Sequence, residues 1–372
     1  MLKEELNLKE KLNRYLAQIK DPDTAAMANA RARLDDLAKP PGSLGKLEEI
    51  AVKLAGISGG MVYDTSKRCV IIMSSDNGVV EEGVASAPQS VTYIQTLNFT
   101  KGITGAAVIA KQFNTDLIIV DVGINADVNH PQIKNKKIRK GTWNIARREA
   151  MTYDEALRAI LAGIETAVEA AKSGYKIIGA GEMGIGNTTT SSAVLCALTG
   201  ISAEQAAGKG AGLDDQAYQK KIKVIKTALE INKPDSGDPV DVLAKVGGFD
   251  IAALAGVYIG CAVMGIPAVI DGFISMAAAL AAYRLNPAVK NSMFASHASF
   301  EQGYAHASKA LGLEPPLNLD MRLGEGSGCP IMFAVMDAAC AVIRDMGTFA
   351  QADIGADYLD KVKDGDNFTV NK

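Results

Sequence analysis

Two glutamates lie in glycine-rich runs, where a charged side chain has few packing contacts with its neighbours and can face a ligand. Glu182 lies in the run GAGEMG at residues 179–184, and Glu325 lies in the run RLGEGSG at residues 322–328. Glycines permit unusual backbone angles and a close approach by a ligand. Each carboxylate is therefore a candidate general acid or base. The alternative for Glu325 is a plain charge that stabilises the N-terminus of a helix expected from about Pro330.

The run at 179–184 also satisfies the pattern GxGxxG of dinucleotide-binding proteins, so a nicotinamide-dependent dehydrogenase is one hypothesis. That fingerprint needs a helix that opens among the glycines and an acidic residue that closes the next strand. Here the helix is expected only from Asn187 and Thr188, and Glu204 lies in the helical sequence SAEQAA. The pattern instead indicates a strand-to-helix turn whose hydroxyls suit a phosphate or a ribose, or an ordinary helix cap.

From Cys69 onward, short apolar runs alternate with helical patterns. This alternation predicts an α/β fold, a three-layer α/β/α arrangement with a mostly parallel Rossmann-like sheet, plus a small helical domain. Strands are expected at 69–73, 117–122, 177–179 and 268–270, and helices near 91–112, 153–172, 188–198, 216–231, 249–264 and 273–285.

Polar residues and glycines gather where these strands end, at 74–78, 123–125, 181–184 and 271–272. In open parallel sheets, ligands bind outside the carboxyl ends of the strands. The sequence therefore predicts a site at this edge of the sheet, with Glu182 in it.

A small helical domain is expected from both termini, residues 1–62 and 318–372, beside a large α/β domain, residues 63–317, that carries the substrate site. The run KPPGSLG at 39–45 forces a turn within the smaller domain. The uncharged stretch 251–270 has the length of a membrane span. Its glycines and Pro267 instead indicate a buried helix that ends near Met264, followed by a core strand, and no membrane partner is expected.

The composition excludes several classes of protein. A hydrophobic content of 48% with 22% charged residues describes a folded protein. Because 39 Lys and Arg are balanced by 42 Asp and Glu, no broad positive field exists to hold nucleic acid. Five scattered cysteines and an N-terminus that lacks a signal peptide predict reduced thiols and a cytoplasmic location. The three histidines form no Cys/His cluster, so no metal site is expected.

Three runs together resemble the signatures of the nicotinate-nucleotide:dimethylbenzimidazole phosphoribosyltransferases: KPPGSLG at 39–45, GEMGIGNTT at 181–189 and RLGEGSG at 322–328. Further matches at 121–123, 208–215, 247–248, 271–273 and 296–297 extend the resemblance from about residue 30 to residue 345.

The resemblance assigns roles to individual side chains. It implies that Glu325 is the catalytic base and Glu182 a supporting carboxylate. It also implies that Ser86 contacts the base and that a set of residues surrounds the nucleotide phosphate, namely Arg322, Gly184, Ser299 and Lys221, with Lys220 as the alternative to Lys221. The other expected site residues belong to the same motifs: Asn187, Thr188, Leu323 and Gly324.

The chain departs from the family pattern at three positions. Ile94 aligns with a glutamine of the family, Asn77 with a usual histidine, and Asp250 with a usual glutamate. A pocket that hydrogen-bonds its ligand discriminates strongly, whereas an apolar wall does not. Ile94 therefore predicts relaxed selectivity among bases.

The resemblance implies transfer of the 5-phosphoribosyl group of nicotinate mononucleotide to 5,6-dimethylbenzimidazole or a related aromatic base. The products would be an α-ribazole-type 5′-phosphate, for cobamide assembly, and nicotinate. It further implies a homodimer and no cofactor. The alternatives are a paralogue that acts on phenolic or purine bases in a heterodimer, and a sensor that binds nucleotide or base without turnover.

Overall fold

The computed structural model describes residues 2–355, and within them the chain forms a six-stranded sheet in which every pairing is parallel. The strand order is β3-β2-β1-β4-β5-β6. The strands are β1 (Arg68–Ser75), β2 (Asp116–Gly123), β3 (Ile133–Asn135), β4 (Ile177–Met183), β5 (Ala268–Ile270) and β6 (Met293–Ala295). This order reverses between β1 and β4, and ligands of doubly wound sheets bind at such a switch point. The predicted α/β class with a parallel sheet is confirmed.

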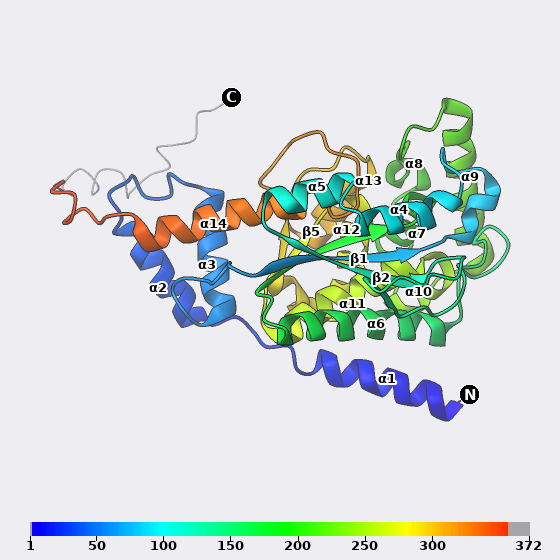
Figure 1. The fold of residues 1–372 in the computed structure, drawn as a ribbon, viewed down its shortest axis with the longest axis horizontal. Helices are drawn as coiled ribbons and strands as arrows, with labels where there is room; N and C mark the ends of the chain where they lie inside the picture. Colours follow the sequence, from blue (N-terminus) through cyan, green and yellow to red (C-terminus); the bar gives the residue numbers. More distant parts are fainter. Residues whose placement is uncertain (1, 356–372) are drawn as a thin grey trace. The chain divides into compact units, whose positions relative to one another are not determined.

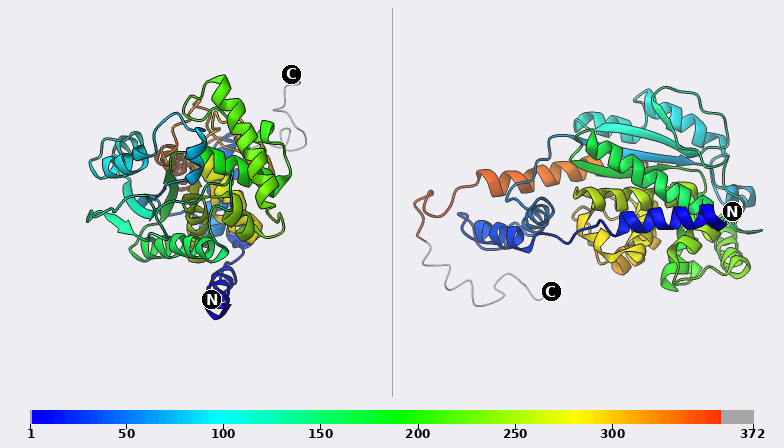
Figure 2. Two further views of the ribbon diagram at one scale, coloured as in Figure 1. Left: turned by 90° about the vertical axis from the view of Figure 1, so that its right-hand side faces the viewer. Right: turned by 90° about the horizontal axis from the view of Figure 1, so that it is seen from below.

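Helices cover both faces of the sheet (Figures 1 and 2). The helix α11 (Phe249–Met264) packs on β1, β2, β4 and β5, and α6 (Tyr153–Lys172) packs on α11. On the opposite face, α4 (Ser90–Thr100) packs on β1, β2 and β4, and α5 (Gly105–Gln112) packs on β2. The chain also contains the helices α1 (Leu2–Leu16), α7 (Asn187–Thr199), α8 (Ala203–Ala206), α9 (Asp215–Asn232), α10 (Pro239–Val246), α12 (Phe273–Leu285) and α13 (Gly303–Leu311). Short 3-10 turns lie at Gly78–Glu82 and Pro287–Ser292.

Glycines explain why the apolar run at 251–270 is a core helix. A Cβ added to Gly256 would lie 1.9 Å from the carbonyl oxygen of Ile160, and one added to Gly163 would lie 1.9 Å from that of Ala253. The backbones of α6 and α11 therefore touch directly, and only glycine allows this approach. The helix ends at Met264 and β5 follows, as predicted. In residues 2–355 no helix is both long and apolar enough to cross a membrane.

The single helix expected near 91–112 is wrong, because the structure has two helices there. Gly102 adopts a left-handed conformation with φ of +72°, and Thr104 then caps α5 by accepting a hydrogen bond from the backbone N–H of Ala107 at 3.1 Å. The strand expected at 177–179 continues to Met183, so Glu182 lies in β4 and not in a turn. The short strands β3 and β6 and the helices α8, α10 and α13 were not predicted from the sequence.

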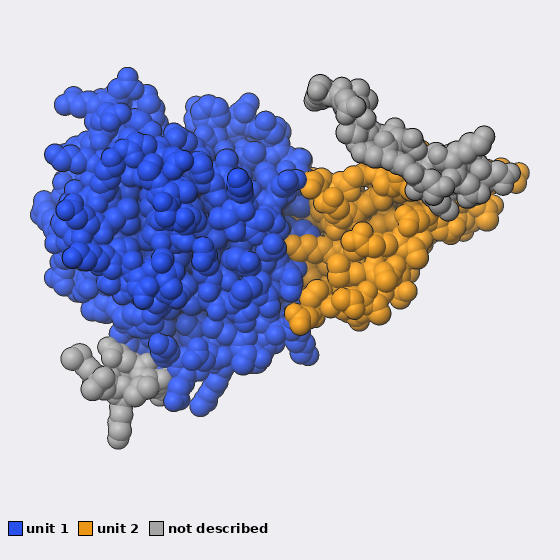
Figure 3. All heavy atoms as spheres, turned by 180° about the vertical axis from the view of Figure 1, so that it is seen from behind, with its two compact units in different colours: residues 1–20, 66–332 blue, residues 21–65, 333–372 orange. Residues whose placement is uncertain are grey.

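The chain divides into two compact units, residues 1–20 with 66–332 and residues 21–65 with 333–372 (Figure 3). These boundaries differ from the expected 1–62 with 318–372. Leu12 is buried in the core of the larger unit and Lys11 pairs with Glu165 at 2.6 Å, so the first helix belongs there. The division falls inside α14 (Cys329–Asp345).

The smaller unit contains α2 (Thr24–Asp35) and α3 (Lys46–Ser58). Its KPPGSLG turn is held by Glu48, whose carboxylate pairs with the buried Lys39 at 2.8 Å and accepts a hydrogen bond from the backbone N–H of Leu44 at 3.0 Å.

Candidate active site

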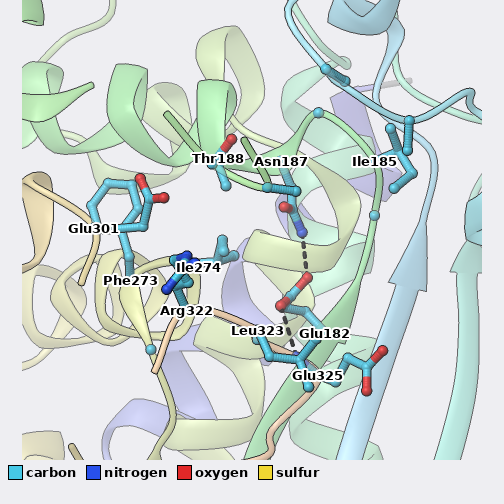
Figure 4. A pocket seen from close by; sticks show the side chains of 18 of the residues that line it. Glu182, Ile185, Asn187, Thr188, Phe273, Ile274, Glu301, Arg322, Leu323 and Glu325 are labelled. Atoms are coloured by element: carbon cyan, nitrogen blue, oxygen red, sulfur yellow. Dashed lines mark hydrogen bonds between the residues drawn. The ribbon is translucent and has the colours of Figure 1, made fainter. Parts of the chain in front are cut away.

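A cavity of about 310 Å³ lies where the chain leaves β4, β5 and β6. Figure 4 places Glu325 on one side of it and Glu301 with Arg322 on the other. The cavity contains most of the residues expected in the site. Those that line it are Ser86, Glu182, Gly184, Asn187, Thr188, Ser299, Arg322, Leu323, Gly324 and Glu325; Lys221 and Ile94 do not.

Glu325 projects from a loop with a strained backbone. Gly324, Glu325 and Gly326 have φ values of +82°, +63° and +80°. The Glu325 side chain is 5% exposed, and both carboxylate oxygens accept hydrogen bonds. Gln95 donates its Nε2 to Oε1 at 2.7 Å, and the backbone N–H of Ala106, in the first turn of α5, donates to Oε2 at 3.1 Å. These two hydrogen bonds orient the side chain, and the second one places its Oε2 at the N-terminus of α5.

Glu182, at the carboxyl end of β4, supports this loop from behind. Its Oε1 accepts a hydrogen bond from the backbone N–H of Glu325 at 3.3 Å, and its Oε2 accepts one from Asn187 (Figure 4). Burial raises the pKa of Glu182 to about 8, and the charges of Asp250 and Asp271 add to this effect. At neutral pH the Glu182 carboxyl is therefore mostly protonated.

Two of the three family departures lie in contact. The Nδ2 of Asn77 donates to Asp250 Oδ2 at 3.4 Å, and the Nδ2 of Asn187 donates to the same oxygen at 3.0 Å. Asp250 is fully buried, and burial raises its pKa to about 6. Asn77 and Asp250 therefore belong to the surroundings of Glu182 and do not line the cavity.

The third departure, Ile94, is corrected by the structure. Its side chain is 50% exposed and lies outside the cavity, whereas the next residue, Gln95, lines the cavity and bonds Glu325. Successive residues of a helix point about 100° apart, so a shift of one position moves a side chain off the face. Gln95 thus occupies the helix face on which Ile94 was expected, and the prediction of relaxed selectivity, which assumed that Ile94 faces the cavity, loses its premise.

The opposite side of the cavity carries hydroxyl groups, cations and the carboxylate of Glu301. Lys221 lies behind this wall and donates its Nζ to Thr188 Oγ1 and to the carbonyl of Gly208, both at 2.9 Å. The side chain is fully buried, and burial lowers its pKa to about 8. Lys220, the alternative, is exposed. Arg322 and Lys209 add positive charge to the lining.

Sequence reasoning missed several lining residues, namely Gln95, Lys209, His297 and Glu301. Lys209 and His297 lie in runs that the resemblance had matched, and Gln95 lay one position from the residue chosen. Glu301 had no such signal. Among residues 2–355, the side chains of His, Cys, Asp and Glu form no group of three that could hold a metal ion.

The chain is similar to proteins of one named family over almost its whole length. A family model described as "Phosphoribosyltransferase" matches residues 19–354. A nicotinate-nucleotide–dimethylbenzimidazole phosphoribosyltransferase of Clostridium perfringens is 53% identical over 96% of this chain and 99% of its own length. One of Acetivibrio thermocellus is 52% identical over 88% and 93%. The crystal structure of CobT from Thermus thermophilus is 38% identical, with a TM-score of 0.86 over 89% of this chain and 99% of that one.

Proposed function

Because the chain belongs to the nicotinate-nucleotide–dimethylbenzimidazole phosphoribosyltransferase family, we propose that it moves the 5-phosphoribosyl group of nicotinate mononucleotide to 5,6-dimethylbenzimidazole or a related aromatic base. The products are an α-ribazole-type 5′-phosphate, used in cobamide assembly, and nicotinate. The observation that carries this proposal is the Glu325 carboxylate, held in the cavity by Gln95 and by the N-terminus of α5.

The substrate is already activated, because nicotinate leaves from a positively charged pyridinium nitrogen. A ring nitrogen of the incoming base attacks C1′ from the opposite face as the bond from C1′ to nicotinate breaks and its electron pair neutralises the pyridinium. Glu325 takes the proton from the second ring nitrogen of the base, and the configuration at C1′ inverts from β to α. The enzyme contributes alignment and a proton acceptor.

The two sides of the cavity divide this work. Glu325, Gln95, Ser86 and Leu323 line the side proposed for the aromatic base. Thr188, Ser299 and Arg322 line the side proposed for the phosphate, with Gly184 beside them and Lys221 behind Thr188. Guanidinium and ammonium groups bind phosphate through charge-assisted hydrogen bonds. Glu182 and Asn187 keep the Glu325 loop in place.

The test is to incubate the purified protein with nicotinate mononucleotide and a panel of benzimidazoles, purines and phenols, and to identify the products by mass. Formation of the α-nucleotide of dimethylbenzimidazole supports the proposal. Transfer to phenols or purines alone points to the paralogue activity, and binding of either substrate without turnover points to a sensor.

We further propose that the protein is a cytoplasmic homodimer. Several large apolar side chains are exposed on the larger unit: Ile94, Ile103, Val108, Phe300, Leu319 and Leu323 are each at least half exposed. Exposed apolar groups of this kind mark association surfaces. All five cysteines are buried free thiols, which suits a reducing compartment. Sedimentation of the purified protein, alone and with any paralogue from the same cell, distinguishes a homodimer from a heterodimer.

A further inference from the structure

Asp271, which directly follows β5, binds the loop that carries Glu325 through two hydrogen bonds. Its side chain is 2% exposed. Its Oδ2 accepts a hydrogen bond from the backbone N–H of Gly326 at 3.1 Å, and its Oδ1 accepts one from that of Gly328 at 2.7 Å. With the bond from the N–H of Glu325 to Glu182, three N–H groups of this loop are held by carboxylates at the ends of two neighbouring strands.

The loop needs such support because its backbone is unfavourable by itself. A non-glycine residue in the left-handed region, as Glu325 is with φ of +63°, has an unfavourable backbone conformation that persists only where the surroundings impose it. Gly324 and Gly326, on either side, adopt the same region and have few intrinsic preferences. The position of the Glu325 carboxylate therefore depends on external contacts.

Asp271 itself has little freedom. Its backbone N–H donates to Ser275 Oγ at 3.1 Å, and its carbonyl accepts from Ser296 Oγ at 3.1 Å. Burial raises the pKa of its carboxyl to about 7, and the two N–H groups of the loop oppose that rise. Because both oxygens of this buried carboxyl accept hydrogen bonds from backbone N–H groups beside Glu325, Asp271 fixes the conformation of the loop that carries Glu325.

We propose that Asp271 is a positioning residue for the transfer reaction, which fixes the Glu325 loop so that the base carboxylate meets the incoming aromatic nitrogen. The inference rests on the proposed function, in which Glu325 takes the proton. Asp271 does not line the cavity, so it acts through Glu325 and not on the substrate. Displacing a catalytic group by about 1 Å can cost about 100-fold in rate.

The test is a double-mutant cycle with the full chain. Asp271→Asn keeps the shape but turns an amide toward an N–H donor, and we expect kcat to fall about 10- to 100-fold while KM for nicotinate mononucleotide changes less than about threefold. In the Glu325→Gln background the same change should cost less than about threefold, because residues that act as one unit are not additive. If Asp271→Asn does not fold, Asp271→Glu, which keeps the charge but moves the carboxylate, replaces it with the same expectation.

Asp121→Asn is the matched control. Asp121 is also buried at the carboxyl end of a strand, and its Oδ1 accepts from the N–H groups of Gly123 and Ile124 at 3.1 and 2.9 Å, but it does not line the cavity or touch the 322–328 loop. We expect Asp121→Asn to lower the melting temperature with little change in kcat.

Full additivity of the two substitutions, an unchanged kcat in Asp271→Asn, or a loss confined to KM would each overturn the positioning role. A wild-type protein without transferase activity, or a Glu325→Gln variant of normal activity, would instead refute the proposed function itself.

Discussion

Replacing Glu325 with Gln isolates the proton-accepting step, because the amide has the shape of the carboxylate but cannot take a proton at neutral pH. General-base catalysis contributes about 100- to 10,000-fold, so kcat should fall by at least about 100-fold. At about 1.36 kcal/mol for each tenfold change, this is a loss of about 2.7 kcal/mol of transition-state stabilisation.

The contacts of Glu325 indicate that the variant folds. The N–H of Ala106 is fixed in α5, so the new amide must turn its oxygen toward it and its NH₂ group toward Gln95. Gln95 can rotate its own amide and accept that hydrogen bond, at the cost of the one that Asn98 now donates to its Oε1 at 3.2 Å. One hydrogen bond is then lost, about 0.5–1.5 kcal/mol of stability.

The assay is steady-state transfer from nicotinate mononucleotide to dimethylbenzimidazole, with product separated by chromatography and identified by mass, and with melting temperatures measured beside it. Glu230→Gln, on an exposed position of α9, is the matched control and should retain wild-type activity and stability. A folded Glu325→Gln variant with near-normal kcat would show that another group takes the proton.

Three further outcomes are expected. Burial raises the folded-state pKa of Glu182 from 4.5 to about 8, so its contribution to stability is fully present below about pH 4.5 and is lost as the pH rises toward 8. In chemical denaturation, the free energy of unfolding of the wild type should therefore fall over that pH range relative to that of Glu182→Gln. A difference between the two proteins that does not change with pH would contradict this. Gln95→Ala should lower kcat about tenfold, because it removes the hydrogen bond to one carboxylate oxygen of Glu325. Ile94→Ala, at an exposed position, should change kcat by less than about twofold. The reverse pattern would show that Ile94, and not Gln95, is the residue that matters for the reaction. Lys221→Met should raise KM for nicotinate mononucleotide about 10- to 100-fold, because it removes the charge-assisted hydrogen bond, of about 1.5–3 kcal/mol, that orients the Thr188 hydroxyl in the cavity wall. Lys220→Met, at an exposed position, should leave this KM unchanged.

The sheet could be predicted because its central strands are uninterrupted apolar runs and its helices are long. The Gly265 to Pro267 break located both the end of α11 and the start of β5, since neither residue type continues a helix. The division between α4 and α5 was missed because the two glycines there, Gly102 and Gly105, lie in an otherwise continuous helical pattern, and isolated glycines are tolerated within helices. The break between the two helices matters for the site, because it creates the N-terminus of α5, where the backbone N–H of Ala106 binds Glu325.

The site was predictable as far as its motifs reach. Glu182 and Glu325 were found because charges among glycines have no packing role, and the structure brings them together through the backbone N–H of Glu325. Gln95 was missed because alignment of a short pattern cannot fix a register of one residue, and on a helix that register decides which side chain faces the ligand. Asp271 could be placed at a strand end, but its role depends on the return of a loop more than 50 residues later in the chain.

The buried carboxyl groups around Glu325 lower the stability of the protein but fix the geometry of the site. Glu182, Asp250 and Asp271 are all buried, and each has its pKa raised by burial, to about 8, 6 and 7. Removing such groups from water costs free energy unless they bind hydrogen-bond donors or protons. Here two of them bind the strained Glu325 loop and the third shares Asn187 with Glu182. Two of the acids that lower stability at alkaline pH, Glu182 and Asp271, thus also hold the Glu325 loop in place, so we expect activity and stability to be coupled through them.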